Sequence, residues 1–157
     1  MKMKKYSVPK NFNSSIGHDS LDNYQFLRKN AEQDSTSYWE SVAERIDWFD
    51  KWTTINNTDY SKAHIEWFSN GKLNASYNCI DRHIENGLGE KTALIWQSND
   101  PTISTNVSYN ELLKKVSLFA NGLKRAGINK GDRVCIYIQM IPEAIIAMLA
   151  CARIGAV

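Results

Sequence analysis

The chain has 157 residues, which is enough for one domain with a hydrophobic core of its own. Its 19 basic and 17 acidic residues nearly balance, so composition argues against a nucleic-acid-binding surface. The longest apolar run falls short of the ~20 residues of a membrane span, and no signal-peptide pattern follows the N-terminal lysines. We therefore expect a soluble protein of the cytoplasm that binds neither nucleic acid nor membrane.

The N-terminal part begins with a polar leader over residues 1–20, which we expect to be irregular or disordered. The pattern then predicts a helix over Leu21–Gln33, capped by Ser20. A second helix follows, for which Ser37 and Glu40 form a capping box. Its apolar face is predicted to contain Trp39, Val42, Ala43 and Ile46.

Aromatic residues dominate the segment from Tyr38 to Phe68, which holds four of the five tryptophans. Few aliphatic residues accompany them, so this segment is predicted to dock as a strap on a larger body. A platform for stacking nucleic-acid bases is the alternative. It is disfavoured because the rings are interspersed with acidic rather than basic residues, namely Asp47, Asp50, Asp59 and Glu66.

The middle of the chain predicts alternating helices and strands. A helix over Asn74–Asn86 takes Asn74 as its cap and stops at Gly87. The pattern predicts a strand over Thr92–Gln97 and a short partner strand at Asn106–Val107. The next helix begins with a capping box of Ser108 and Glu111 and stops at Gly127. Its apolar stripe comprises Leu112, Val116, Phe119, Ala120 and Leu123.

The last 24 residues predict one strand and one helix of a parallel α/β unit. Residues 134–138 are rich in β-branched and aromatic side chains, as in a strand covered on both faces. Pro142–Ile154 is so apolar that we expect it to be buried all round, with Gly155 as its C-terminal cap. Ala156-Val157 then opens a second parallel strand. We interpret the chain as the N-terminal piece of a longer α/β protein.

The residues alone predict no catalytic, cofactor-binding or metal-binding site. Cys79 and His83 lie four apart on a helix, but two ligands do not make a tetrahedral metal site, so a structural role is favoured. The glycine pairs lack the spacing of phosphate-binding loops. Residues 139–141 follow the predicted strand 134–138 at its carboxyl end, where ligands can bind, although a plain loop is the favoured interpretation. The three cysteines are expected to be buried free thiols: Cys79, Cys135 and Cys151.

Several strings after about residue 35 together resemble the N-terminal region of AMP-forming acetyl-CoA synthetases, in the adenylate-forming superfamily. The first group is Tyr38-Trp39, Trp48-Phe49-Asp50-Lys51-Trp52, Trp67-Phe68, Gly71-Lys72-Leu73-Asn74 and Tyr77-Asn78-Cys79-Ile80-Asp81-Arg82-His83. The second group is Ala93-Leu94-Ile95-Trp96, Ser108-Tyr109, Glu111-Leu112, Lys130-Gly131-Asp132-Arg133-Val134, Pro142-Glu143 and Ala147 to Val157.

The resemblance implies a ligase that activates acetate with ATP, assisted by Mg²⁺, and passes the acetyl group to coenzyme A. It also implies an N-terminal helical extension over residues 21–90 and the start of the AMP-binding domain over 91–157. The family's phosphate loop, nucleotide motif and catalytic lysine do not occur here, so no site residue is carried over. The chain is expected to be inactive scaffold, packed against the remainder of its polypeptide.

Two other interpretations stay open from the sequence. A propionyl-CoA or acetoacetyl-CoA synthetase has a similar N-terminal region, and the acyl pocket lies outside these residues. A non-catalytic protein-binding module is the alternative from another class. It predicts a monomer that folds on its own, whereas a scaffold piece exposes a large apolar surface.

Overall fold

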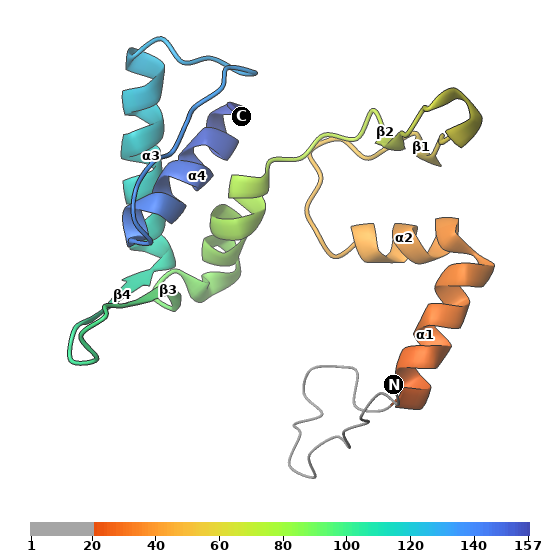
Figure 1. The fold of residues 1–157 in the computed structure, drawn as a ribbon, viewed down its shortest axis with the longest axis horizontal. Coiled ribbons are helices and arrows are strands. Elements are labelled where there is room, and N and C mark those ends of the chain that lie inside the picture. The colour runs from red at the N-terminus through yellow and green to blue at the C-terminus, as the bar shows by residue number, and fades with distance from the viewer. Residues whose placement is uncertain (1–20) are drawn as a thin grey trace, which may run out of the picture. The chain divides into compact units, whose positions relative to one another are not determined.

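A computed structural model describes residues 21–157, which form two compact units (Figure 1). The smaller unit contains the described residues up to Arg45 together with Ile55–Trp67, and the larger contains Ile46–Thr54 with Phe68–Val157. The expectations for the leader and for Ser20 as a cap lie outside the described residues. None of the helices between residues 21 and 157 has the length and apolar character needed to span a bilayer.

Two helices begin the smaller unit, α1 (Leu21–Gln33) and α2 (Ser35–Ala43). The first has the predicted bounds. The capping box predicted for the second is wrong, because the N-cap is Asp34, whose carboxylate accepts hydrogen bonds from Ser37 N (3.0 Å) and Ser37 Oγ (2.7 Å). These bonds lower the pKa of Asp34, the bond from the Ser37 backbone most of all. Since α2 ends at Ala43, Ile46 lies beyond the helix and is exposed.

The aromatic segment folds back on itself in a two-stranded sheet of β1 (Thr54–Asn56) and β2 (Trp67–Ser69). A short 3₁₀ turn, η2 (Tyr60–Lys62), lies between the strands. Within the smaller unit, Trp39 meets Trp67 edge to face at 6.3 Å between ring centroids. Within the larger unit, three rings pack pairwise at 5.0–5.5 Å, namely Trp48, Trp52 and Phe68. Each of the four tryptophans of this segment therefore contacts at least one other aromatic ring.

The helix predicted from Asn74 is present, but much of it has wide π-type turns, η3 (Tyr77–Asp81) and η4 (Ile84–Leu88). Asn74 caps it as predicted, since its Oδ1 accepts a hydrogen bond from Tyr77 N at 3.2 Å. Gly87 ends the regular backbone with a left-handed φ of 78°. Capping and stop signals are local, whereas the wide turns have no comparable sequence signal.

An antiparallel hairpin follows, made of β3 (Thr92–Gln97) and β4 (Ser104–Ser108), and leads into α3 (Tyr109–Arg125). The capping box is confirmed, because Ser108 Oγ accepts from Glu111 N and Glu111 accepts from Ser108 N. The apolar stripe of α3 is confirmed except at Phe119, which is 45% exposed. The core of the larger unit comprises Ile80, Val107, Leu112, Val116, Ala120, Ile146 and Ala150.

The last helix, α4 (Pro142–Ile154), packs along α3 (Figure 1). Pro142 stands in its first turn and Gly155 ends it with a left-handed φ of 76°, as predicted. The prediction that α4 is buried all round is wrong. Met148 is 58% exposed, because no other part of the described chain covers that side of the helix.

The segment 134–138 is extended but is not a strand, since the described residues supply no ladder for it. The prediction that both of its faces are covered is also wrong, because Tyr137 is 97% exposed. One bridge does form. Val157 N donates to Asp132 O (2.8 Å) and Val134 N donates to Val157 O (2.7 Å). In a parallel pair of strands, one residue bonds in this way to the two residues that flank its partner. Val157 therefore pairs with this segment in the parallel direction.

Helices combined with strands confirm the α/β class predicted from sequence. The regular sheets of the described chain are two antiparallel pairs, and the parallel element is limited to the bridge at Val157.

Candidate functional site

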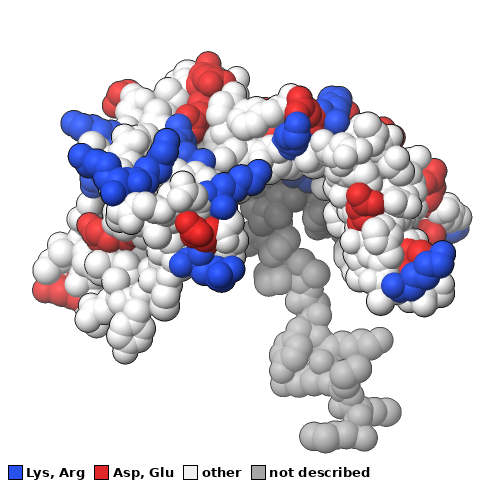
Figure 2. Space-filling model, turned by 90° about the horizontal axis from the view of Figure 1, so that it is seen from above, with Lys and Arg blue, Asp and Glu red and all other residues white. Residues whose placement is uncertain are grey.

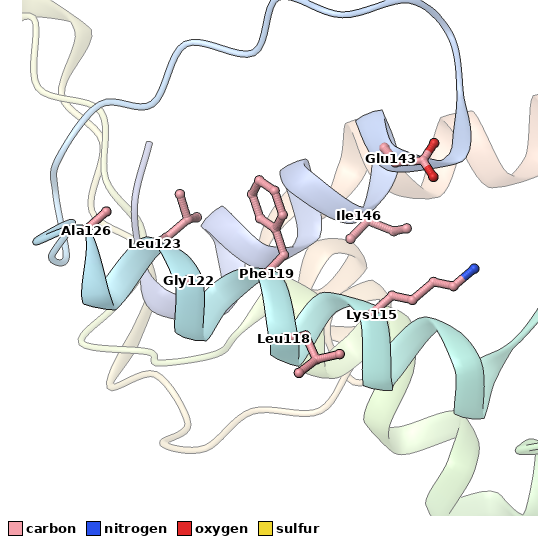
Figure 3. Close-up of a pocket in the computed structure, with 8 residues that line it drawn as sticks. All are labelled: Lys115, Leu118, Phe119, Gly122, Leu123, Ala126, Glu143 and Ile146. Atoms are coloured by element: carbon pink, nitrogen blue, oxygen red, sulfur yellow. The ribbon is translucent and has the colours of Figure 1, made fainter.

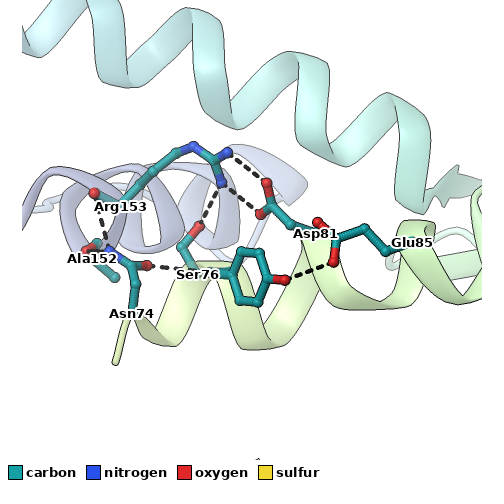
Figure 4. A network of polar contacts seen from close by, with 7 residues as sticks. Asn74, Ser76, Asp81, Glu85, Ala152 and Arg153 are labelled. Carbon is teal, nitrogen blue, oxygen red and sulfur yellow. Dashed lines mark hydrogen bonds and ion pairs between the residues drawn. The ribbon is translucent and has the colours of Figure 1, made fainter. Parts of the chain in front are cut away.

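A polar cluster of the larger unit joins the end of α4 to residues 74–81 (Figure 4). The guanidinium of Arg153 donates two hydrogen bonds to the carboxylate of Asp81, at 2.7 and 2.8 Å, and a longer one to Ser76 Oγ at 3.5 Å. The Arg153 side chain is 29% exposed and that of Asp81 is 17% exposed. A paired, partly desolvated fork of this kind orients both side chains more strictly than a surface ion pair does.

Asn74 links the same two helices through its side-chain amide. Its Nδ2 donates to the carbonyl oxygens of Ala152 and Arg153, both at 3.1 Å, while its Oδ1 caps the helix that it precedes. The Asn74 side chain therefore forms hydrogen bonds with a backbone N–H at the start of its own helix and with two backbone carbonyl groups at the end of α4. The amide group, with both a donor and an acceptor, suits this position.

Tyr77 and Glu85 form a second polar contact on the same helix. The Tyr77 hydroxyl donates to Glu85 Oε2 at 2.6 Å, and the ring meets Phe49 edge to face. The hydrogen bond to Glu85, followed by burial, raises the pKa of Tyr77 to about 12. The folded chain therefore holds this proton more tightly than the unfolded chain, whose tyrosines titrate at about 10.

This shift predicts a loss of stability at alkaline pH. The contribution of Tyr77 is fully present below pH ~10 and is lost as pH rises from ~10 to ~12. Glu85→Gln removes the negative charge beside the hydroxyl, so the pKa of Tyr77 is expected to fall toward 10. Ultraviolet titration of each protein, with Tyr77→Phe subtracted to isolate this ring among the seven tyrosines, measures the shift. Identical Tyr77 curves for the wild type and Glu85→Gln would contradict it.

An open apolar groove of about 640 Å³ lies between α3 and α4 (Figure 3). Its walls are mostly hydrophobic, with Lys115 and Glu143 toward one end. The remaining lining residues are Leu118, Phe119, Gly122, Leu123, Ala126 and Ile146. A second hollow, lined by Phe119, Glu143 and much of the extended segment 134–138, shares two residues with the groove. Together they give the larger unit an extended apolar face.

This apolar face predicts that the 157-residue chain on its own binds a hydrophobic dye and self-associates, because exposed patches of this kind drive association. Fluorescence of a bound dye and light scattering measure the two effects. Leu118→Lys, at a groove residue that is 60% exposed, is expected to lower both signals. Tyr60→Lys is the matched control, since Tyr60 is 78% exposed in the smaller unit and lies outside the groove. A monomer with a sharp thermal transition and no dye binding would contradict this expectation.

Residues 139–141 line a smaller hollow of about 450 Å³ beside the end of β3. Trp96 Nε1 donates a hydrogen bond to Met140 O at 2.8 Å, which fastens this loop to the hairpin. Met140 itself is 83% exposed. None of the residues that line the hollow is charged. Residues 139–141 form a loop that the Trp96 hydrogen bond holds in place.

Two of the three cysteines differ from their prediction. Cys79 and Cys135 are exposed, Cys79 on the outer side of its helix and Cys135 on the extended segment without a ladder partner. Cys151 is buried in α4 as predicted, and burial raises the pKa of its thiol. His83 packs against the Tyr109 ring at 4.9 Å, which gives it a structural contact.

The comparisons with known proteins match the chain in two consecutive parts. Residues 24–79 match the family model of the acetyl-coenzyme A synthetase N-terminus, and residues 81–157 match that of the AMP-binding enzymes. The acetyl-coenzyme A synthetase of Magnetococcus marinus is 51% identical over 87% of this chain, and that of Halorhodospira halophila is 44% identical over 98%. The corresponding enzyme of Leptospira biflexa is 45% identical over 92%.

This chain belongs to the acetyl-coenzyme A synthetase family. The resemblance that its sequence motifs predict is thereby confirmed. The aligned part corresponds to 21–24% of the length of these relatives, so the chain spans less than a quarter of each.

The described residues were compared with two kinds of site, a metal-binding cluster and a glycine-rich phosphate loop. Between residues 21 and 157 no three His, Cys, Asp or Glu side chains cluster in a way suited to Mg²⁺ or another metal. The glycines of the two candidate phosphate loops are explained by the backbone conformations and hydrogen bonds that they make. Gly87 and Gly127 adopt left-handed φ where helices end, and Gly131 N donates to Gly155 O. On the face in view in Figure 2, several Lys and Arg side chains adjoin one another at the left, with Asp and Glu side chains around them.

Proposed function

We propose that this chain is scaffold in an enzyme that activates acetate with ATP and transfers the acetyl group to coenzyme A. The observation that carries the proposal is the order of the two family matches, an acetyl-coenzyme A synthetase N-terminus followed directly by an AMP-binding match. The names of the relatives support the same substrate. Residues 21–90 would form the N-terminal extension and 91–157 the first part of the AMP-binding domain, in a protein of the cytoplasm.

The proposed reaction has two steps. An acetate oxygen attacks the α-phosphorus of ATP, a new P–O bond forms, and pyrophosphate leaves with the electrons of the broken P–O bond. The sulfur of coenzyme A then attacks the acetyl carbonyl, AMP leaves, and the thiol proton is released. Both steps need positive charge and hydrogen-bond donors at oxygens where negative charge gathers. The described residues supply no such set, so we propose that the 157-residue chain has no ligase activity on its own.

Instead, these residues would support the first helices and the first parallel strand pairing of the AMP-binding domain. The core around Ile80 joins the helix after Asn74 to α3 and α4, and the bridge at Val157 starts a parallel pairing. Ligands of parallel α/β folds bind beyond the carboxyl ends of the strands. Residues 139–141 lie at that end of the extended segment, and their tethering by Trp96 gives this edge a defined backbone.

Thioester formation by the protein encoded by the full reading frame tests the proposal. Acetate, propionate and acetoacetate are compared as substrates with ATP and coenzyme A, and kcat/KM is measured for each. The account predicts the highest value for acetate. A higher value for propionate or acetoacetate would assign the chain to the corresponding acyl-CoA synthetase, and no thioester with any of them would contradict a ligase.

A further inference from the structure

The end of α4 is held at a fixed residue by side chains distant in sequence. Helix ends fray because their last carbonyl groups lack partners within the helix. Here Asn74 Nδ2 donates to two of the last carbonyl groups, that of Arg153 and that of Ala152, which also accepts from Gly155 N. The Arg153 side chain is itself held by Asp81. The last turn of α4 is therefore held by hydrogen bonds from residues that lie 72–79 positions earlier in the chain.

This last turn of α4 lies immediately before the parallel bridge. Gly155 turns the chain with a left-handed φ of 76°, Ala156 N donates back to Cys151 O, and Val157 then takes both bonds of the bridge. Only three residues separate Arg153 from Val157, so the residue at which α4 stops decides which residue reaches the bridge. A shift of one residue would turn every following side chain to the opposite face of the sheet.

These contacts also cross the boundary between the two family matches. Asn74 and Ser76 belong to the acetyl-coenzyme A synthetase N-terminus match, whereas Asp81 and α4 belong to the AMP-binding match. The larger compact unit likewise includes residues from both. The end of the first matched segment is thus part of the packing of the second.

We propose that Asn74, Asp81 and Arg153 are positioning residues that set the register of the parallel strand beginning at Val157. They act through the end of α4, which their hydrogen bonds hold. The functional part of this inference rests on the proposed ligase, because ligands of such sheets bind beyond the carboxyl ends of the strands whose register is set here. A strand entering in the wrong register presents the wrong side chains to that edge.

The test uses the protein expressed from the full reading frame and the variant Asn74→Asp. Aspartate keeps the oxygen that caps the helix after residue 74 but loses the amide that donates to α4, and its charge opposes the carbonyl end of that helix. Arg153→Lys keeps the positive charge and loses the two-pronged bond to Asp81. The control is Tyr77→Phe, which removes a hydrogen bond of the same helix that does not reach α4.

Two measurements are made on each protein, amide hydrogen exchange in peptides containing Val134 and steady-state kinetics. Asn74→Asp and Arg153→Lys are expected to speed exchange about tenfold and to raise KM for coenzyme A or acetate about tenfold, with a smaller change in kcat. Tyr77→Phe is expected to change neither. A fall in melting temperature without either change would overturn the inference. If the wild type has no ligase activity, the proposed function fails, and the exchange measurement still decides whether these residues hold Val157 in its pairing with Val134.

Discussion

Replacing Ile80 with alanine is expected to destabilise the larger unit by about 2–5 kcal/mol. The Ile80 side chain is fully buried and belongs to the core that joins residues 75–88 to α3 and α4. Shortening it removes apolar contacts and leaves a cavity that the surrounding helices fill only in part. Urea unfolding at sub-micromolar concentration, followed by tryptophan fluorescence, measures the free energy of unfolding.

The matched control is Ile95→Ala, which removes the same atoms from a side chain that is 70% exposed on β3. Its expected effect is within about 0.5 kcal/mol of zero. Equal losses at the two positions would mean that Ile80 does not lie in a packed core, and would contradict the arrangement of these helices.

A second large effect is expected at the end of α4, where Gly155→Ala should cost about 1–2 kcal/mol. Gly155 has a φ of 76°, and a Cβ added there would lie 2.9 Å from Lys130 Cγ. The lysine side chain can move, so the backbone conformation accounts for most of the cost.

Gly122→Ala is the control, and it is expected to raise the free energy of unfolding where Gly155→Ala lowers it. Gly122 lies within α3 with no atom within 4 Å of an added Cβ, and alanine is favoured over glycine inside a helix by about 1 kcal/mol. Urea unfolding should therefore show one variant less stable and the other more stable than the wild type. A stabilising Gly155→Ala would contradict the left-handed turn that leads into Val157.

Helices and strands whose ends are marked by capping or stop residues close by in the sequence could be predicted from the sequence. The bounds of α1 and β3, the capping box of Ser108 and Glu111, and the stop at Gly155 all agree with the structure. Each depends on residues within one or two turns of one another, so a single sequence carries the information.

Burial was less predictable, because it depends on neighbours distant in the chain. Phe119, Met148 and the extended segment 134–138 have the composition of core residues, yet nothing in the described chain covers them fully. The contacts of Asn74 with the end of α4 also have no sequence signal, since they join residues 78 and 79 apart. The missed cap at Asp34 is different. Both Asp34 and Ser37 are good caps, and only the backbone decides between them.

Acetate-dependent exchange between ATP and labelled pyrophosphate is the most direct measurement of the central claim, that these residues are scaffold in an acetate-activating ligase. It is made on the 157-residue chain and on the protein encoded by the full reading frame. We predict exchange that requires acetate for the longer protein and none for the 157-residue chain. Robust exchange by the 157-residue chain, or none by the longer protein, would contradict the account.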